Sequence, residues 1–190
     1  MNEPIFILRG DICYSRNLTE LAVMKQGYVI CKEGVSLGVC QELPGEYQNL
    51  PIRDCGEDLI LPGLCDLHVH APQYTFRGLG MDLELLDWLN EHTFPEEGKY
   101  QDLEYARKAY GDFVHNLKES ATTRACIFGT IHVPATELLM DMLEASGLHT
   151  MVGKVNMDRN CPAYLIEKSA DISAEDTVEW IKDCKKRYQI

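Results

Sequence analysis

Two histidines separated by a single residue are the side chains in this sequence best suited to chemistry. His68 and His70 belong to an apolar stretch, residues 65–70, that predicts a β-strand. Because side chains alternate along a strand, both imidazoles and the carboxylate of Asp66 are expected on one face. Neutral imidazole binds zinc at about 2.0–2.1 Å, so the pair predicts two ligands of one metal ion. Taken alone, a His-x-His pair is weak evidence, because it more often reflects chance or ordinary packing than a metal site.

The four other histidines give weaker signals for a site. His92 lies at the end of a predicted helix and is expected to be solvated or to cap that helix. His115 lies within a helix, and His149 precedes a strand at the end away from the histidine pair, so both are expected to be structural. His132 follows a strand, where barrel enzymes place their active-site loops, and the alternative for it is packing within the loop.

Two further groups of side chains have simple structural interpretations. Trp88 and its neighbours Leu83, Leu86 and Leu89 have the spacing of an apolar helix stripe, which predicts packing rather than a base-stacking surface. The adjacent pair Glu96-Glu97 is expected to be exposed surface, because charged residues are almost never fully buried unless they are paired.

The elements that must position the histidine pair follow from the pattern of residues 62–190. Strands are predicted at 65–70, 122–128 and 150–157, and helices at 83–90, 102–119, 135–145 and from Ser173 onward. Gly147 is expected to end the third of these helices. Strands that alternate with helices indicate a parallel sheet covered by helices. The fold class expected is therefore α/β, a TIM-type (β/α)8 barrel of which about the first three βα units are present. A doubly wound dinucleotide fold is disfavoured, because no Gly-x-Gly-x-x-Gly follows the first strand.

Residues 1–61 follow a different pattern of short apolar runs broken by Gly, Pro and Asp. Such runs predict antiparallel β structure, with a hairpin formed by residues 28–31 and 35–40 around Glu33-Gly34. We therefore expect a small β-rich N-terminal domain over 1–61, which forms part of a β-sandwich, and the barrel portion over 62–190.

Composition restricts the class of protein and its partners. Apolar residues make up 45% and charged residues 25% of the 190 residues, which is typical of a soluble globular protein. The net charge of −12 argues against nucleic acid and anionic membranes as partners. No apolar run approaches the roughly 20 residues of a membrane span. The eight scattered cysteines, without a C-x-x-C pair, predict reduced thiols and a cytoplasmic location.

The segment Pro62-Gly63-Leu64-Cys65-Asp66-Leu67-His68-Val69-His70 carries a resemblance to a known family. An apolar-Pro-Gly-apolar-x-Asp-x-His-x-His pattern, placed between a β-rich section and βα units, is similar to the signature of the amidohydrolase superfamily of metal-dependent hydrolases. Within that superfamily the chain resembles the guanine deaminase family from about residue 59 to its end, most specifically around Trp88. The segments that carry this narrower resemblance are residues 70–74, 80–89, 92–96, 128–132 and 153–160.

This resemblance implies zinc-dependent hydrolysis of guanine to xanthine and ammonia, a step of purine catabolism. His68 and His70 match the family's first two zinc ligands, and Zn2+ lowers the pKa of bound water to about 7. The residues implied in substrate binding are His70, Ala71, Pro72 and Gln73. The Gln73 carboxamide offers both a donor and an acceptor to the edge of a purine base. The resemblance also implies a homodimer for the full-length enzyme, with the small molecule guanine as its partner.

The remaining site residues of the family have no matching position in this sequence. They are two histidines, an aspartate, a proton-shuttling glutamate and a purine-binding arginine, so no catalytic residue is identifiable within the chain. Because a catalytic zinc usually has three protein ligands, we expect the N-terminal part of a longer enzyme, inactive and weak in zinc binding by itself. The alternatives are another amidohydrolase, such as a cytosine or S-adenosylhomocysteine deaminase or a chlorohydrolase, and a non-catalytic assembly module.

Overall fold

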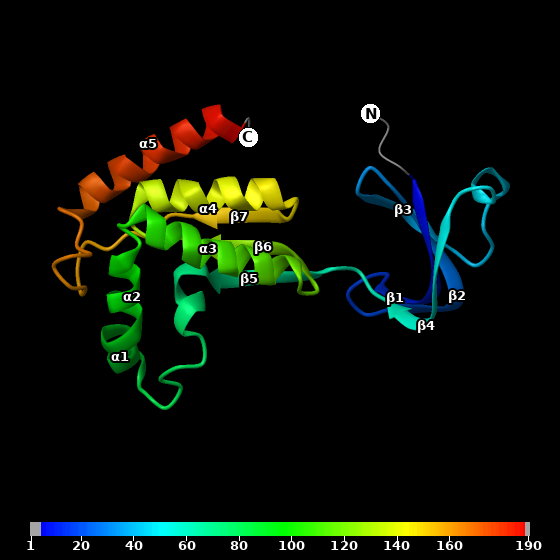
Figure 1. Cartoon of the computed structure of the whole chain (residues 1–190), viewed down its shortest axis with the longest axis horizontal. Helices are drawn as coiled ribbons and strands as arrows, with labels where there is room; N and C mark the ends of the chain where they lie inside the picture. The colour runs from blue at the N-terminus through cyan, green and yellow to red at the C-terminus, as the bar shows by residue number, and fades with distance from the viewer. Residues whose placement is uncertain (1–4, 189–190) are drawn as a thin grey trace. The chain divides into compact units, whose positions relative to one another are not determined.

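The structure is a computed structural model that describes residues 5–188 (Figure 1). The chain divides into two compact units, Met1–Pro62 and Gly63–Ile190, and each unit contains its own β-sheet. Within the described residues, no helix is both long and apolar enough to cross a membrane.

The first unit is a four-stranded sheet with the strand order β3-β2-β1-β4. Its strands are β1 (Phe6–Ser15), β2 (Leu21–Lys32), β3 (Val35–Cys40) and β4 (Ile52–Ile60), and a short 3-10 turn, η1 (Gly45–Tyr47), precedes β4. The predicted hairpin is present, since β2 and β3 pair antiparallel and Lys32 faces Val35. Glu33 and Gly34 form its turn with φ angles of 52° and 73°, the left-handed conformation that such turns require.

One expectation for this unit was wrong. The pattern predicted antiparallel pairing throughout, whereas β4 pairs parallel with β1, with Ile7 opposite Ile52. The connection through η1 carries the chain from β3, at one edge of the sheet, to the opposite edge, where β4 enters in the same direction as β1. Ile7, Ile12 and Ile30 are the buried apolar side chains of this sheet.

The second unit contains a parallel sheet with the strand order β5-β6-β7. This parallel sheet and the helices between its strands confirm the predicted opening of a (β/α) barrel. The elements in chain order are β5 (Leu64–His70), η2 (Ala71–Phe76), α1 (Leu85–Trp88), the π-helical turn η3 (Leu89–Thr93), α2 (Phe94–Lys99), α3 (Leu103–Lys118), β6 (Thr122–Phe128), α4 (Val133–Ser146), β7 (His149–Gly153) and α5 (Ala170–Tyr188).

The two long helices α3 and α4 pack against this sheet, as Figure 1 shows. Asp102 begins α3, because its carboxylate accepts the backbone N–H of Glu104 at 2.9 Å. Gly147 ends α4 with φ 78°, as the sequence predicted. The core between the helices and the sheet contains Ala106, Ala109, Tyr110, Phe113, Val114, Ala125, Ile127, Ala135, Leu139 and Leu143.

The last strand and the last helix differ from the sequence prediction. Strand β7 ends at Gly153 instead of residue 157. Helix α5 begins at Ala170, so Ser173 lies within its first turn and does not cap it. The hydroxyl of Ser169 accepts the N–H of Ile172 at 3.2 Å and fulfils the capping function expected of Ser173.

The predicted apolar stripes on two helices are only partly buried. On α5, Cys184 is buried, but Val178 and Ile181 are exposed, and Trp180 takes the buried position instead. Near α1 the side chain of Leu86 is exposed, while the indole N–H of Trp88 donates to the carbonyl of Leu79 at 3.1 Å. Spacing alone therefore identified the helices but not the whole of their buried faces.

Candidate functional site

The histidine pair lies at the carboxyl end of β5, beside the end of β6. The ring centroids of His68 and His70 are 5.1 Å apart, so strand alternation does bring the imidazoles together. The ring of Phe128, the last residue of β6, lies 4.7 Å from each imidazole and stacks on His70 at an interplanar angle of 14°. Register explains this contact, because His70 pairs with Phe128 across the parallel ladder.

The surroundings of the pair favour a neutral imidazole at His70. His70 is half-buried, and this burial, together with the charge of the neighbouring His68, lowers the pKa of its side chain below the ordinary value. The carboxylate of Asp66 accepts the backbone N–H of His68 at 3.1 Å, which fixes the strand just before the pair. A neutral ring with a free nitrogen is the form that binds a metal ion.

The two rings also have a separation that suits a shared metal ion. Imidazole nitrogens about 2.0–2.1 Å from one tetrahedral zinc place their ring centroids about 5 Å apart. The centroid separation of 5.1 Å is close to this value. Between residues 5 and 188, however, no three His, Cys, Asp or Glu side chains gather closely enough to hold a metal. The described residues therefore place two imidazoles together, without a third such side chain beside them.

The segment that the sequence assigned to substrate binding begins directly after His70. It forms the 3-10 helix η2, in which Ala71 and Pro72 are buried and Gln73 is partly exposed. The ring of Tyr74 packs edge-on against Phe113 of α3, with centroids 5.5 Å apart. The segment is thus attached to the core on one side of Gln73 by Pro72 and on the other by Tyr74.

The remaining histidines lie apart from the pair. His132 is half-buried at the position preceding α4, burial lowers its pKa, and its Nε2 atom has no hydrogen-bond partner. His92 stacks on Phe76 with centroids 6.1 Å apart. A Cβ atom on Gly80, which has φ 64°, would lie 2.6 Å from the His92 ring, so this close approach requires glycine. His115 and His149 are exposed.

The expectation that Glu96 and Glu97 are exposed was wrong. Their exposed fractions are 6% and 4%, and both lie in α2, which contacts the segment η2 that follows β5. The Glu96 carboxylate accepts hydrogen bonds from Thr75 at 2.6 Å, from Lys99 at 2.6 Å and from Tyr105, which stabilise its charged form. Burial alone would raise its pKa, but these donors together lower it.

Glu97 differs from its neighbour because, among the described residues, no cationic side chain forms an ion pair with its carboxyl, whereas Lys99 pairs with Glu96. Its Oε2 atom is buried without a hydrogen-bond partner, as are the hydroxyls of Thr93, Tyr110 and Thr130. Burial, reinforced by the negative charge of Glu96, raises the pKa of Glu97 to about 7, although the nearby Thr130 hydroxyl opposes the shift. The groups that face this carboxyl are Glu96 on its own helix, Tyr100 and Tyr110, and Thr130 after β6.

We expect Glu97 to make the second unit less stable as the pH rises. The folded state keeps its proton up to about pH 7, whereas the unfolded chain releases it near 4.5, so folding binds a proton between these values. From pH 5 to pH 8 the free energy of unfolding should fall by about 2–3 kcal/mol through this group. Glu97→Gln should remove this dependence in urea titrations followed by tryptophan fluorescence.

The matched control for this measurement is Glu91→Gln, at an exposed glutamate of η3. The difference in free energy of unfolding between Glu91→Gln and the unmodified chain should be the same at pH 5 and pH 8. To isolate the contribution of Glu97 from that of other groups, the quantity to compare is the free energy of unfolding of the unmodified chain minus that of Glu97→Gln at each pH. A difference that does not change with pH would contradict the assignment of a protonated Glu97.

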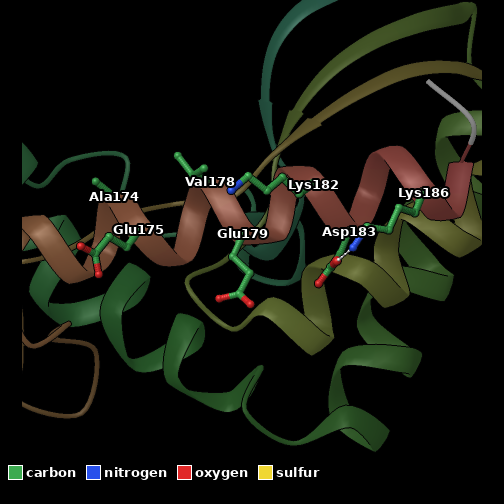
Figure 2. A pocket seen from close by; sticks show the side chains of 7 residues that line it. All are labelled: Ala174, Glu175, Val178, Glu179, Lys182, Asp183 and Lys186. Atoms are coloured by element: carbon green, nitrogen blue, oxygen red, sulfur yellow. Dashed lines mark hydrogen bonds and ion pairs between the residues drawn. The ribbon is translucent and has the colours of Figure 1, made fainter.

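A hollow of about 470 Å³ lies on α5, away from the histidine pair (Figure 2). Its lining comes from one helix, and Figure 2 shows the side chains spread along α5 rather than converging on a point. Asp183 and Lys186 pair with each other at 2.9 Å. The hollow is therefore an exposed helix face and contains none of the groups described above.

Comparison with known proteins gives matches along nearly the whole chain. Residues 59–189 match the model of the Amidohydrolase family. The chain is 31% identical to a guanine deaminase of Dictyostelium discoideum, over 95% of this chain and 44% of that protein, and 36% identical to that of Escherichia coli K12, over 90% and 40%. The crystal structure of guanine deaminase from C. acetobutylicum with bound guanine in the active site is 42% identical, with a TM-score of 0.88 over 95% of this chain and 43% of that one. The chain thus spans less than half the length of these relatives.

Proposed function

This chain belongs to the amidohydrolase family, and on that premise we propose that it forms the N-terminal part of a zinc-dependent guanine deaminase. The reaction is the hydrolysis of guanine to xanthine and ammonia, as in purine catabolism. The observation that carries the proposal is the pair His68 and His70, 5.1 Å apart at the end of β5 and followed at once by the segment containing Gln73. The 42% identity to a guanine deaminase over 95% of the chain supports the choice of substrate.

In this proposal His68 and His70 hold the zinc ion through neutral imidazole nitrogens. When bound, zinc supplies a water molecule activated for attack near neutral pH. Phe128 limits the freedom of both rings, because it lies 4.7 Å from each and stacks on His70. A ligand held in place before the metal arrives loses less conformational entropy on binding.

Recognition of guanine is assigned to His70, Ala71, Pro72 and Gln73. The Gln73 carboxamide presents a carbonyl oxygen as acceptor and an amide group as donor, which together complement the edge of a purine. The buried Ala71 and Pro72 fix the backbone on which this side chain is carried. In the overall reaction the bond between the ring carbon and the exocyclic amine breaks, and that carbon gains oxygen from water.

The relatives extend well beyond the part that this chain matches, so completion of the site is part of the proposal. The further zinc ligands and the group that moves protons to the leaving ammonia would come from polypeptide equivalent to the remaining length of those relatives. We propose that the full-length enzyme is a cytoplasmic homodimer and that each subunit contains such a completed site. The N-terminal sheet and the barrel portion then belong to one subunit.

A fusion protein tests this function. Residues 1–190 replace the matching N-terminal part of the C. acetobutylicum guanine deaminase, and xanthine formation and ammonia release are measured. We expect zinc to be retained through dialysis and guanine to be hydrolysed with a kcat of at least about 1 s⁻¹, the low end for ordinary enzymes. The separate 190-residue chain should hold zinc weakly and turn over no guanine.

A substrate panel distinguishes this proposal from the alternatives. Cytosine, S-adenosylhomocysteine and a chlorinated triazine are offered to the same fusion under the same conditions. Turnover of one of these with none of guanine would assign the chain to another amidohydrolase activity. A folded fusion that neither retains zinc nor turns over any of the four compounds would favour a non-catalytic assembly role.

A further inference from the structure

The segment η2 is bonded to other elements as well as within itself. It is a short 3-10 helix, and the hydrogen bond that closes its end, from the N–H of Arg77 to the carbonyl of Tyr74, is long at 3.4 Å. Pro72 has no N–H to donate. Contacts with other elements therefore add to what holds Gln73 in the middle of this segment.

Helix α2 supplies two such contacts, one on each side of Gln73. The hydroxyl of Tyr100, at the end of α2, donates to the carbonyl of Pro72 at 3.3 Å. The hydroxyl of Thr75 donates to the carboxylate of Glu96 at 2.6 Å. Residues 72 and 75 are thus both attached to α2, and Gln73 lies between them.

Glu96 suits this task because its carboxylate accepts from three donors at once. Besides Thr75, its oxygens accept from Lys99, at 2.6 Å, and from Tyr105 at the start of α3. A carboxylate has only acceptor sites, so it can accept several donors without presenting a hydrogen that would repel them. Bonds to an ionised acceptor are also about twice as strong as neutral ones. Glu96 itself has an exposed fraction of 6%, whereas the Lys99 side chain that bonds to it is 52% exposed.

We propose that Glu96 is a positioning residue for purine recognition, which holds η2 through Thr75 so that Gln73 meets the edge of the base in a fixed orientation. This inference rests on the proposed function and adds a residue that does not itself touch substrate. The two ends of a carboxamide differ only in which is donor and which is acceptor. Discrimination between bases therefore depends on the orientation of η2, the segment that carries the Gln73 carboxamide. Order established before binding lowers the entropy cost of recognition.

Hydrogen exchange of the 190-residue chain tests the structural half of this inference. Thr75 and Tyr105 share one oxygen of Glu96 and Lys99 uses the other. Glu96→Gln removes the negative charge and leaves one acceptor oxygen, so the bond from Thr75 is either lost or weakened to that of a neutral pair. We expect the backbone amides of residues 73–77 to exchange at least about tenfold faster, while those of β6 keep their rates. Glu97→Gln is the matched control, one residue along α2 and equally buried, and should leave residues 73–77 unchanged. Equal exchange in Glu96→Gln and the unmodified chain would overturn the proposal.

Kinetics of the fusion protein test the recognition half. Glu96→Gln should raise KM for guanine about tenfold and change kcat much less, since it removes order needed for binding. Gln73→Ala should abolish that effect, so that Glu96→Gln adds nothing to Gln73→Ala in a double-mutant cycle. Additive effects, or an unchanged KM in an active fusion, would overturn the inference alone. A folded fusion without guanine turnover in its unmodified form would instead contradict the proposed function.

Discussion

His70→Ala in the fusion protein is expected to lower kcat/KM for guanine by about a thousandfold or more. Loss of metal-derived stabilisation of the transition state costs several kcal/mol, and each 1.36 kcal/mol corresponds to a factor of ten in rate. The side chain is one of only two imidazoles at the end of β5, and no other His, Cys, Asp or Glu of the described residues joins them to make a group of three. Steady-state kinetics and the zinc content after dialysis should fall together.

The control for this substitution is His115→Ala. His115 is exposed on α3 and makes no contact with the pair, so its replacement should leave both zinc content and kcat/KM within about twofold, as expected of a surface substitution. Full zinc occupancy and full activity in His70→Ala would exclude His70 as a ligand. Loss of activity with unchanged zinc would instead assign it to substrate contact alone.

Lys154→Ala should destabilise the second unit by about 3–5 kcal/mol, the cost of leaving one partner of a buried ion pair without compensation. Lys154 follows β7 and has 2% of its side chain exposed, and its Nζ atom lies 2.7 Å from Glu167, which is 13% exposed. The same carboxylate accepts from the backbone N–H of Met157 at 2.6 Å and from Ser173 at 2.8 Å. Burial would raise the pKa of Glu167, but these donors and Lys154 lower it, so the group stays charged.

Urea unfolding followed by tryptophan fluorescence measures this change, because both tryptophans belong to the second unit. The matched control is Lys186→Ala on α5, where the partner Asp183 lies 2.9 Å away and both side chains are more than half exposed. An exposed pair of this kind contributes at most about 1 kcal/mol. Equal effects of the two substitutions would contradict the conclusion that Lys154 and Glu167 form a buried ion pair.

The features that the sequence predicted well are those with local causes. The strand 122–128, the helix ending before Gly147 and the proximity of His68 and His70 depend on alternation, capping and periodicity within a few residues. The order of strands and helices then indicated a parallel sheet, since short crossovers leave few other arrangements.

The features that the sequence did not predict depend on partners distant along the chain. Glu96 is buried because Thr75 and Tyr105 donate to it, and neither lies in its own helix. For Glu97 the sequence did contain a signal of burial. Thr93, Glu97 and Tyr100 have the spacing of one helix face, and in the structure all three are buried. Two adjacent carboxylates nevertheless predict exposure unless their donors are known.

The start of α5 and the contact between His70 and Phe128 also depend on partners that the sequence does not identify. Ser173 had the spacing of a cap, but its hydroxyl donates to Glu167, and the helix begins earlier. Phe128 was visible as the end of a strand. Its stacking on His70 follows from the register between β5 and β6, which the sequence does not state.

The parallel pairing of β1 with β4 has a consequence for how the first unit is assembled during folding. Strands β1, β2 and β3 are neighbours in both sequence and space, so their turns close with little loss of chain entropy. Strand β4 must instead return across the sheet to bring Ile52 beside Ile7. We expect the three-stranded meander to form first and β4 to dock last, since distant pairings form more slowly. Until then β1 is an edge strand whose free side can pair with other polypeptides, and the arrival of β4 covers that side.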